Sequence, residues 1–180
     1  MQATTEVMAR YPLKSESDTQ ALAKVFAESM ELCNALNTGV VVYLEGDLGA
    51  GKSFFSRAFI QAFLPKEKVK SPTYTIVESY NSSKVSIHHF DLYRLCDPEE
   101  LEYLAIRDLL VDRYVALVEW PSKGVPLFPK ADILIRIQHQ DEVSQDFASD
   151  ERLFTMTAVS KMGEQVIQKV GEQFAHPVTE

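Results

Sequence analysis

The chain carries the run Gly46-Asp47-Leu48-Gly49-Ala50-Gly51-Lys52-Ser53, which matches the phosphate-loop pattern G-x-x-x-x-G-K-[S/T] at every fixed position. Glycines let successive backbone N–H groups turn inward around phosphate oxygens. Lys52 can reach the outer phosphates, and the Ser53 hydroxyl can bind magnesium. We therefore predict a P-loop that binds ATP, or a closely related nucleoside triphosphate, with Mg²⁺ through residues 46–53 and the adjoining Phe54.

The segments on either side of this run have the properties that a P-loop needs. The stretch Val40-Val41-Val42-Tyr43-Leu44 is apolar and has no polar face, which is typical of a strand covered on both sides in a parallel sheet. After the run, Phe54 to Phe63 is predicted to be a helix ended by Pro65, with its positive end toward the phosphates. This order favours nucleotide binding over a purely structural glycine turn.

Further strands and helices alternate along the chain. Ser17 and Gln20 form a capping box that predicts a helix over 17–38, ended by Gly39. Two strand-like runs, 75–80 and 85–91, predict an antiparallel hairpin. The other predicted elements are a helix over 97–110, strands over 115–118, 133–137 and 153–159, and a helix over 160–174. The pattern predicts an α/β, P-loop NTPase-like fold: a mainly parallel sheet with an antiparallel hairpin and helices on both faces.

Length and composition suit a single domain over residues 1–180. The chain is 46% hydrophobic and 24% charged, which is ordinary for a globular protein. We expect 1–14 and 175–180 to be loosely ordered and 138–150 to be a mobile loop. Neither a membrane span nor a signal peptide is evident, which predicts a cytoplasmic protein. A net charge of −8 argues against a protein whose main function is to bind nucleic acid.

Two carboxylates at the ends of predicted strands are candidates for the metal site. Glu119 follows an apolar run, and Asp91 ends the second hairpin strand. Because ligands bind at the C-terminal ends of parallel strands, either can be the second metal-binding group that hydrolysis requires. His88 and His89 alternate on a strand, so at most one faces the site, and we interpret them as non-ligands. Trp120, beside Glu119, is expected to form a wall of the site.

Four motifs in this order resemble the TsaE family, also called YjeE, the small bacterial P-loop ATPases of tRNA threonylcarbamoyladenosine synthesis. The motifs are GDLGAGKS at 46–53, SPTY at 71–74, HFDLYR at 89–94 and EW at 119–120. The P-loop alone is shared by many families, whereas its combination with the other motifs is specific. The resemblance covers roughly residues 17–137.

The resemblance implies roles for individual residues. Three oxygen-bearing side chains would form the magnesium shell, directly or through water: Ser53, Asp91 and Glu119. Lys52 and the loop backbone would hold the phosphates. Thr73 would act as a switch-like residue near the γ-phosphate and the metal. Tyr93 and Arg94 would support the site or a partner surface.

The resemblance also implies partners. The family works with TsaD and TsaB, whose complex transfers threonylcarbamoyl to an adenosine beside the tRNA anticodon, and the ATP cycle of TsaE resets that complex between turnovers. Contact with tRNA would therefore be indirect, which suits an acidic chain. We expect the hairpin over 75–91 to lie near the docking surface. Because no arginine finger is evident and a partner can supply one, we expect low basal ATPase activity that the partner stimulates.

Two positions depart from the family pattern, and two other functions fit the P-loop. Ser53 stands where many members have Thr, which keeps the hydroxyl, and Ser122 stands where many carry a second acid, which predicts weaker hydrolysis if that acid activates water. A small P-loop kinase would need an acceptor pocket and usually an arginine-rich lid, but the arginines after the loop are scattered. A nucleotide-gated binding module would use bound ATP to order a loop, with little hydrolysis.

Overall fold

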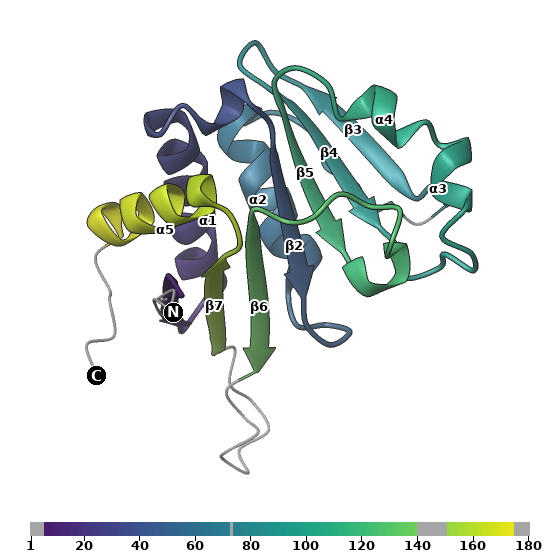
Figure 1. Ribbon diagram of the computed structural model, residues 1–180. Coiled ribbons are helices and arrows are strands. Elements are labelled where there is room, and N and C mark those ends of the chain that lie inside the picture. The colour runs from purple at the N-terminus through teal and green to yellow at the C-terminus, as the bar shows by residue number, and fades with distance from the viewer. Residues whose placement is uncertain (1–5, 73, 140–150, 175–180) are drawn as a thin grey trace, which may run out of the picture.

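The computed structural model describes residues 6–72, 74–139 and 151–174. Its strands are β1 Met8–Leu13, β2 Val40–Glu45, β3 Val77–Asn81, β4 Ser86–Asp91, β5 Tyr114–Glu119, β6 Ile133–His139 and β7 Arg152–Ala158. Within the described residues they form one seven-stranded sheet in the order β1-β7-β6-β2-β5-β4-β3 (Figure 1). The helices are α1 Glu16–Leu32, α2 Lys52–Phe63, α3 Glu100–Tyr103, α4 Ile106–Leu109 and α5 Lys161–Gln173, with short 3₁₀ turns η1 Ala35–Asn37 and η2 Pro121–Gly124.

The central strands β6, β2, β5 and β4 run parallel, as the sequence predicts. Along β2, Val40 and Val42 lie in one hydrophobic core, and Val41 lies in a second core on the opposite face. This burial on both faces explains why β2 has no polar side. The strands β4 and β5 end together, with Asp91 directly opposite Glu119.

Antiparallel strands complete both edges of the sheet. β3 pairs with β4, which confirms the predicted hairpin. On the other edge, β7 pairs with both β6 and β1. The expectation that residues 1–14 are loosely ordered is wrong for Met8–Leu13, because Tyr11 and Leu13 are each 2% exposed and fix this strand in the core. Residues 1–5 and 175–180 lie outside the described residues.

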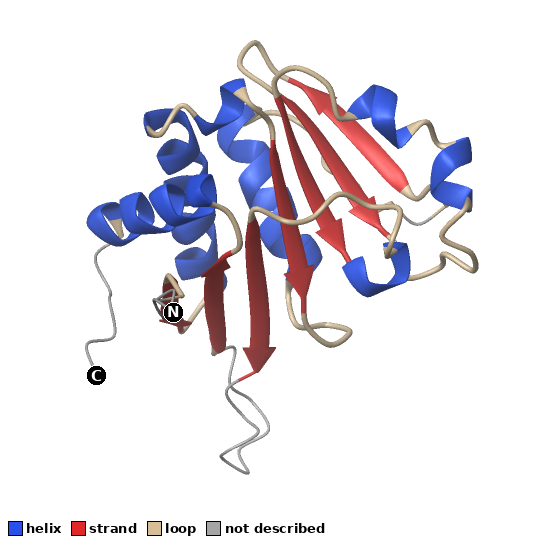
Figure 2. Ribbon diagram, in the orientation of Figure 1, coloured by secondary structure: helices blue, strands red, loops and turns tan. Residues whose placement is uncertain are grey.

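Helices cover both faces, as predicted, but unequally (Figure 2). On one face α1, α2 and α5 pack over the larger core, where Phe26 of α1 contacts Phe55 and Phe59 of α2 with ring centroids 6.0 and 5.6 Å apart. Phe55 also contacts Phe154 of β7 at 5.5 Å. These contacts fix α2, and therefore the loop that precedes it. On the other face the short helices α3 and α4 contribute to the smaller core.

The first helix begins and ends earlier than predicted. Its N-cap is Ser15, whose Oγ accepts a hydrogen bond from the Asp18 N–H at 3.2 Å, so the expected cap at Ser17 is wrong. The helix ends at Leu32 because Asn34 adopts the left-handed conformation, with φ of 56°, which Asn tolerates well. The segment before Gly39 is the separate turn η1.

The predicted helix over 97–110 is two short helices, α3 and α4, separated at Ala105 with φ of 50°. Leu101 and Ile106 both lie in the smaller core. On a continuous helix, side chains five residues apart point about 140° away from each other. The break at Ala105 lets both side chains reach the same core.

The remaining helices and strands agree with the sequence predictions to within a few residues. Of the loop expected over 138–150, Gln138 and His139 belong to β6, and the rest lies outside the described residues. Among the described residues, no helix combines the length and the apolar character that crossing a membrane requires.

Candidate functional site

The glycine loop, residues 46–53, connects β2 to α2 and has a backbone that glycine adopts freely. Gly49 and Gly51 have φ of 79° and 111°, in the region that L-residues with side chains rarely occupy. A Cβ at Gly46 would lie 2.6 Å from the carbonyl oxygen of Ile137, so the loop also approaches β6 too closely for a side chain there. The conformation therefore requires the glycines of the sequence motif.

Lys52 places a cation on the inner side of the glycine loop. The side chain is 6% exposed, and its ammonium donates to the carbonyl oxygens of Gly46 and Asp47, the latter at 2.9 Å. The ammonium also lies 4.5 Å from the centre of the Trp120 ring, within cation–π range. Burial lowers the pKa of Lys52, and nearby carboxylates, Glu119 first among them, oppose this shift.

Glu119 is the central hydrogen-bond acceptor of the site and is 2% exposed. The Ser53 hydroxyl donates to its carboxylate, with Oγ 3.0 Å from Oε1 and 3.3 Å from Oε2. From the other side, His89 Nε2 lies 3.1 Å from Oε2. Because an ionised carboxylate only accepts, Nε2 is the donor in this contact. His88 contacts Ser79 instead, with Nδ1 2.8 Å from Oγ, so one histidine of the pair faces the site, as strand alternation predicts.

Asp91 adds a second carboxylate beside Glu119. Its Oδ1 accepts a hydrogen bond from the Tyr93 backbone N–H at 3.1 Å. Burial raises the pKa of Asp91, and the hydrogen bond from Tyr93 opposes this shift. Both carboxylates line one cavity of about 210 Å³ together with Lys52 and Ser53. The structure therefore brings together the predicted site residues of three separate motifs.

The donor set of this cavity fits a magnesium–nucleotide complex. A hydroxyl and two carboxylates are the hard oxygen ligands that Mg²⁺ prefers, and Mg²⁺ is usually held by one or two carboxylates together with phosphates. An ammonium group and a helix N-terminus suit the phosphates. The cavity is less suitable for a metal ion held by protein side chains without a nucleotide. No group of three or more His, Cys, Asp and Glu residues that could hold a metal occurs in 6–72, 74–139 and 151–174.

The residues expected to support the site lie on the side of β4 and β5. Trp120 has a φ of 57°, and this left-handed turn at the end of β5 lets its ring lie beside Lys52. Tyr93 packs on Trp120 with ring centroids 5.1 Å apart. Arg94 follows on the exposed surface. Thr73, the expected switch-like residue, lies outside the described residues.

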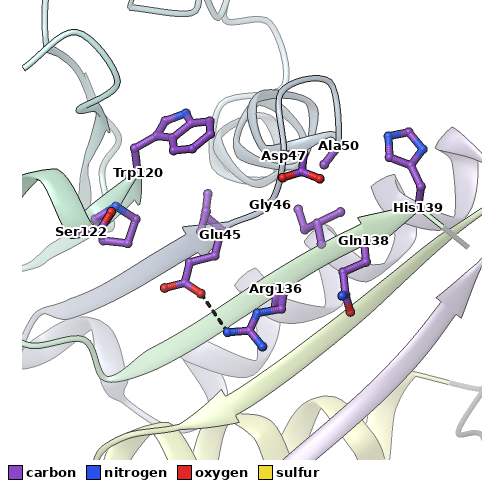
Figure 3. A pocket seen from close by; sticks show the side chains of 12 residues that line it. Glu45, Gly46, Asp47, Ala50, Trp120, Ser122, Arg136, Gln138 and His139 are labelled. Carbon is purple, nitrogen blue, oxygen red and sulfur yellow. Dashed lines mark hydrogen bonds and ion pairs between the residues drawn. The ribbon is translucent and has the colours of Figure 1, made fainter. Parts of the chain in front are cut away.

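Sequence reasoning did not identify a second cavity, of about 340 Å³, on the side of the glycine loop that faces away from α2. Figure 3 shows Glu45 and Arg136 paired along this cavity, with Trp120 at one end and His139 at the other. The pair is 3.1 Å apart and joins neighbouring positions of β2 and β6. The available signal was the alternation of apolar and polar residues over 135–138, which is typical of a strand with one exposed face.

Arg152 is a further residue that the sequence motifs did not identify. It begins β7, and its Nε donates to the carbonyl oxygen of Ala50 in the glycine loop at 3.1 Å. No local pattern marks this position, because the contact exists only when β7 returns antiparallel to β6. His89 could have been recognised, since it lies two residues before Asp91 and therefore on the same face of the strand.

Comparisons with known proteins agree with this architecture. Over 128 residues the chain is 44% identical to the tRNA threonylcarbamoyladenosine biosynthesis protein TsaE of Haemophilus influenzae, covering 71% of this chain and 76% of that protein. The protein of the same description from Bacillus subtilis is 33% identical over 153 residues, with coverage of 85% and 87%. The crystal structure of Bacillus subtilis YdiB superimposes with a TM-score of 0.71 at 25% identity, covering 95% of this chain and 99% of that one.

A sequence model of one family spans most of the chain. The family is described as threonylcarbamoyl adenosine biosynthesis protein TsaE, and its model matches residues 13–147. The matched region contains the glycine loop, Asp91 and Glu119, which meet in one cavity. With the relatives of 33–44% identity pointing the same way, the chain belongs to the TsaE family.

Proposed function

We propose that the chain binds ATP with Mg²⁺ at the glycine loop and hydrolyses the ATP, as its part in tRNA threonylcarbamoyladenosine synthesis. The observation that carries this proposal is the meeting of Ser53 and Glu119, whose Oγ and Oε1 atoms are 3.0 Å apart beside the Lys52 ammonium. A lysine, a hydroxyl and a strand-end carboxylate at the start of a helix are the parts that nucleotide hydrolysis shares across P-loop proteins.

Each side chain has a defined task in this proposal. Lys52 exchanges its loop carbonyl partners for the outer phosphates of ATP. Ser53 and Glu119 hold Mg²⁺, which neutralises charge on the phosphates. Asp91 is more exposed than Glu119, so it is better placed to orient a water molecule. Because Trp120 packs against Lys52, it keeps bulk water away from that side of the loop.

The proposed partners are TsaD and TsaB, and the β3–β4 hairpin is the proposed docking surface. β3 is an edge strand of the described sheet, with backbone groups on its outer side available to another chain. The test is to shorten the turn at 81–84 and to measure affinity for a TsaB–TsaD complex. We expect weaker binding, and unchanged affinity would contradict the docking site without affecting the ATPase proposal.

The ATPase proposal is tested by measuring ATP hydrolysis with and without a TsaB–TsaD complex from the same organism. We expect slow hydrolysis by the chain alone, strong stimulation by the complex, and loss of both in Lys52→Ala. The matched control is Lys169→Ala, which removes a lysine from α5 that pairs with Glu172. If the chain binds ATP but does not hydrolyse it, either alone or with the TsaB–TsaD complex, a nucleotide-gated binding module would be favoured instead.

A further inference from the structure

Four side chains form a continuous stack that leads from the nucleotide cavity to the surface. The Lys52 ammonium lies 4.5 Å from the centre of the Trp120 ring. Tyr93 packs on Trp120 with ring centroids 5.1 Å apart, and the Lys123 ammonium lies 5.1 Å from the centre of the Tyr93 ring. The stack therefore has a cation at each end and two aromatic rings between them, and both cations lie within cation–π range of a ring.

Lys123 fixes the outer half of the stack by a hydrogen bond as well as by its charge. Its ammonium donates to the Tyr93 carbonyl oxygen at 2.7 Å. The backbone N–H of Tyr93 donates in turn to the Asp91 carboxylate at 3.1 Å. Tyr93 is thus held through both of its backbone polar groups, which positions its ring against Trp120.

Trp120 depends on such contacts because its backbone is strained. Its φ of 57° lies in the left-handed region, which is unfavourable for a bulky L-residue. The turn η2 follows directly, and the Lys123 backbone N–H donates to the Trp120 carbonyl oxygen at 3.1 Å. The ring contacts with Lys52 and Tyr93 therefore help to keep Trp120 in this conformation.

The stack also defines a resting position for Lys52. In this position the ammonium donates to the carbonyl oxygens of Gly46 and Asp47 and lies on the Trp120 ring. The lysine of a P-loop binds the outer phosphates of the nucleotide. An ammonium has only three N–H donors, so Lys52 must give up contacts of the resting position when it binds phosphates.

We propose that Lys123 is a positioning residue of the ATP site: through the two aromatic rings it holds Lys52 in the resting position and so limits the affinity for ATP. The inference rests on the proposed function, since it assumes that Lys52 moves to the phosphates. Lys123 is exposed, and Tyr93 is 44% exposed. The outer end of the stack can therefore be altered from outside the nucleotide cavity.

The alternative is that the stack supports Lys52 while it contacts the phosphates. Removing Lys123 would then weaken ATP binding. Long-range electrostatics predicts the same direction, because the loss of a positive charge from a chain of net charge −8 increases its repulsion of anionic ATP. A higher affinity for ATP on removing Lys123 is therefore expected only if Lys123 favours the resting position.

The experiment replaces Lys123 by Met, which keeps an apolar side chain of similar length and removes the ammonium. Calorimetry measures the dissociation constant of ATP with Mg²⁺, and fluorescence records the emission of Trp120, the only tryptophan, without nucleotide. We expect Lys123→Met to tighten ATP binding by about 2- to 30-fold, the fold-change that matches the loss of one cation–π contact by Lys52. The emission should change as well, because Trp120 loses the support of a fixed Tyr93.

Two further variants serve as controls. Lys123→Arg keeps a cation that can stack on Tyr93 and donate to its carbonyl oxygen, so its ATP affinity and emission should stay close to those of the unaltered chain. Lys130 is exposed in the segment that follows η2. Lys130→Met removes the same charge and should not tighten ATP binding. Unfolding temperatures show whether each variant is folded as stably as the unaltered chain.

Unchanged or weaker ATP binding in Lys123→Met would overturn the proposal, and so would an equal gain in Lys130→Met. A purely structural role of Lys123 would lower the unfolding temperature without tightening ATP binding. If the unaltered chain binds no ATP, the proposed function itself fails. In that case, equal Trp120 emission in Lys123→Met and in the unaltered chain would show separately that Lys123 does not position the stack.

Discussion

His89 Nε2 lies 3.1 Å from Glu119 Oε2, and the two side chains are 1% and 2% exposed. The same carboxylate accepts a hydrogen bond from the Ser53 hydroxyl, so Glu119 is held between the start of α2 and strand β4. A buried carboxylate with donors on two sides keeps one orientation. His89 therefore positions a group of the site without contacting the proposed ligand.

Replacing His89 by Phe removes this donor and keeps a ring of similar size. We expect the Mg²⁺ concentration needed for half-maximal ATP binding to rise severalfold, because Glu119 is free to turn from Ser53. The free energy of unfolding should fall by about 1–3 kcal/mol, the range for losing one hydrogen bond to a buried, charged group. Calorimetry over a Mg²⁺ series and urea denaturation measure the two effects. His88→Gln, on the other face, should not alter the Mg²⁺ requirement.

Trp120 is the only tryptophan, and the Lys52 ammonium lies 4.5 Å from the centre of its ring. If Lys52 turns toward phosphates when ATP binds, the indole loses a neighbouring cation and its fluorescence emission changes. We expect a saturable change on adding ATP with Mg²⁺, and a changed baseline without that response in Lys52→Ala. Constant emission under conditions where calorimetry records ATP binding would show that Lys52 stays on the ring.

Asp91→Asn should separate stability from function. Burial raises the pKa of Asp91, so the folded protein binds this proton more readily than the unfolded chain. The favourable contribution of the protonated Asp91 to the free energy of unfolding is present at low pH and is lost as the pH rises through the folded-state pKa. Near neutral pH the buried charge of Asp91 is therefore unfavourable. We expect Asp91→Asn to raise the unfolding temperature of the ligand-free protein and to lower ATP hydrolysis by about 100-fold or more. The exposed Asp108→Asn serves as control, and a lower unfolding temperature in Asp91→Asn would contradict the argument.

His88 should make stability depend on pH. Burial lowers its pKa from the ordinary value of 6.5, and a hydrogen bond with the Leu109 backbone opposes the shift. As the pH falls, the unfolded chain therefore takes up this proton first. The contribution of His88 to the free energy of unfolding is fully present above pH 6.5 and is lost below it, toward the folded-state pKa. Urea denaturation at about pH 7.5, 6.5 and 5.5 should give a steeper loss for the unaltered chain than for His88→Gln. If the free energy of unfolding falls equally with pH in both proteins, His88 is not responsible for the pH dependence.

The glycine loop and the central strands could be predicted because their signals are local. An apolar run, a glycine motif and a helix follow one another between Val40 and Phe63, and each is readable within a few residues. The choice between Ser15 and Ser17 as helix cap was not readable, since each is followed three residues later by a polar side chain that can complete a cap.

Contacts between distant segments were the part that sequence reasoning could not supply. Met8–Leu13 is a strand only because β7 offers it an edge, and Arg152 reaches Ala50 only through the same strand. The meeting of Asp91 and Glu119 was predictable because both end parallel strands, and strand ends of that kind lie at one edge of a sheet.

The break between α3 and α4 can be tested with Ala105→Gly. The direction in which this variant changes the free energy of unfolding distinguishes two short helices from one continuous helix over 97–110. Ala105 is exposed and has φ of 50°, a left-handed conformation that costs an L-residue about 1–2 kcal/mol. Ala105→Gly removes this cost, but the greater entropy of glycine in the unfolded chain offsets about 0.4–1 kcal/mol of the gain. We therefore expect the free energy of unfolding to rise by up to about 1.6 kcal/mol. In a continuous helix over 97–110 the same change would instead destabilise by about 1 kcal/mol, because glycine is a poor helix former. Urea denaturation of Ala105→Gly, with Ala105→Val as the variant that should lose stability, decides between the two.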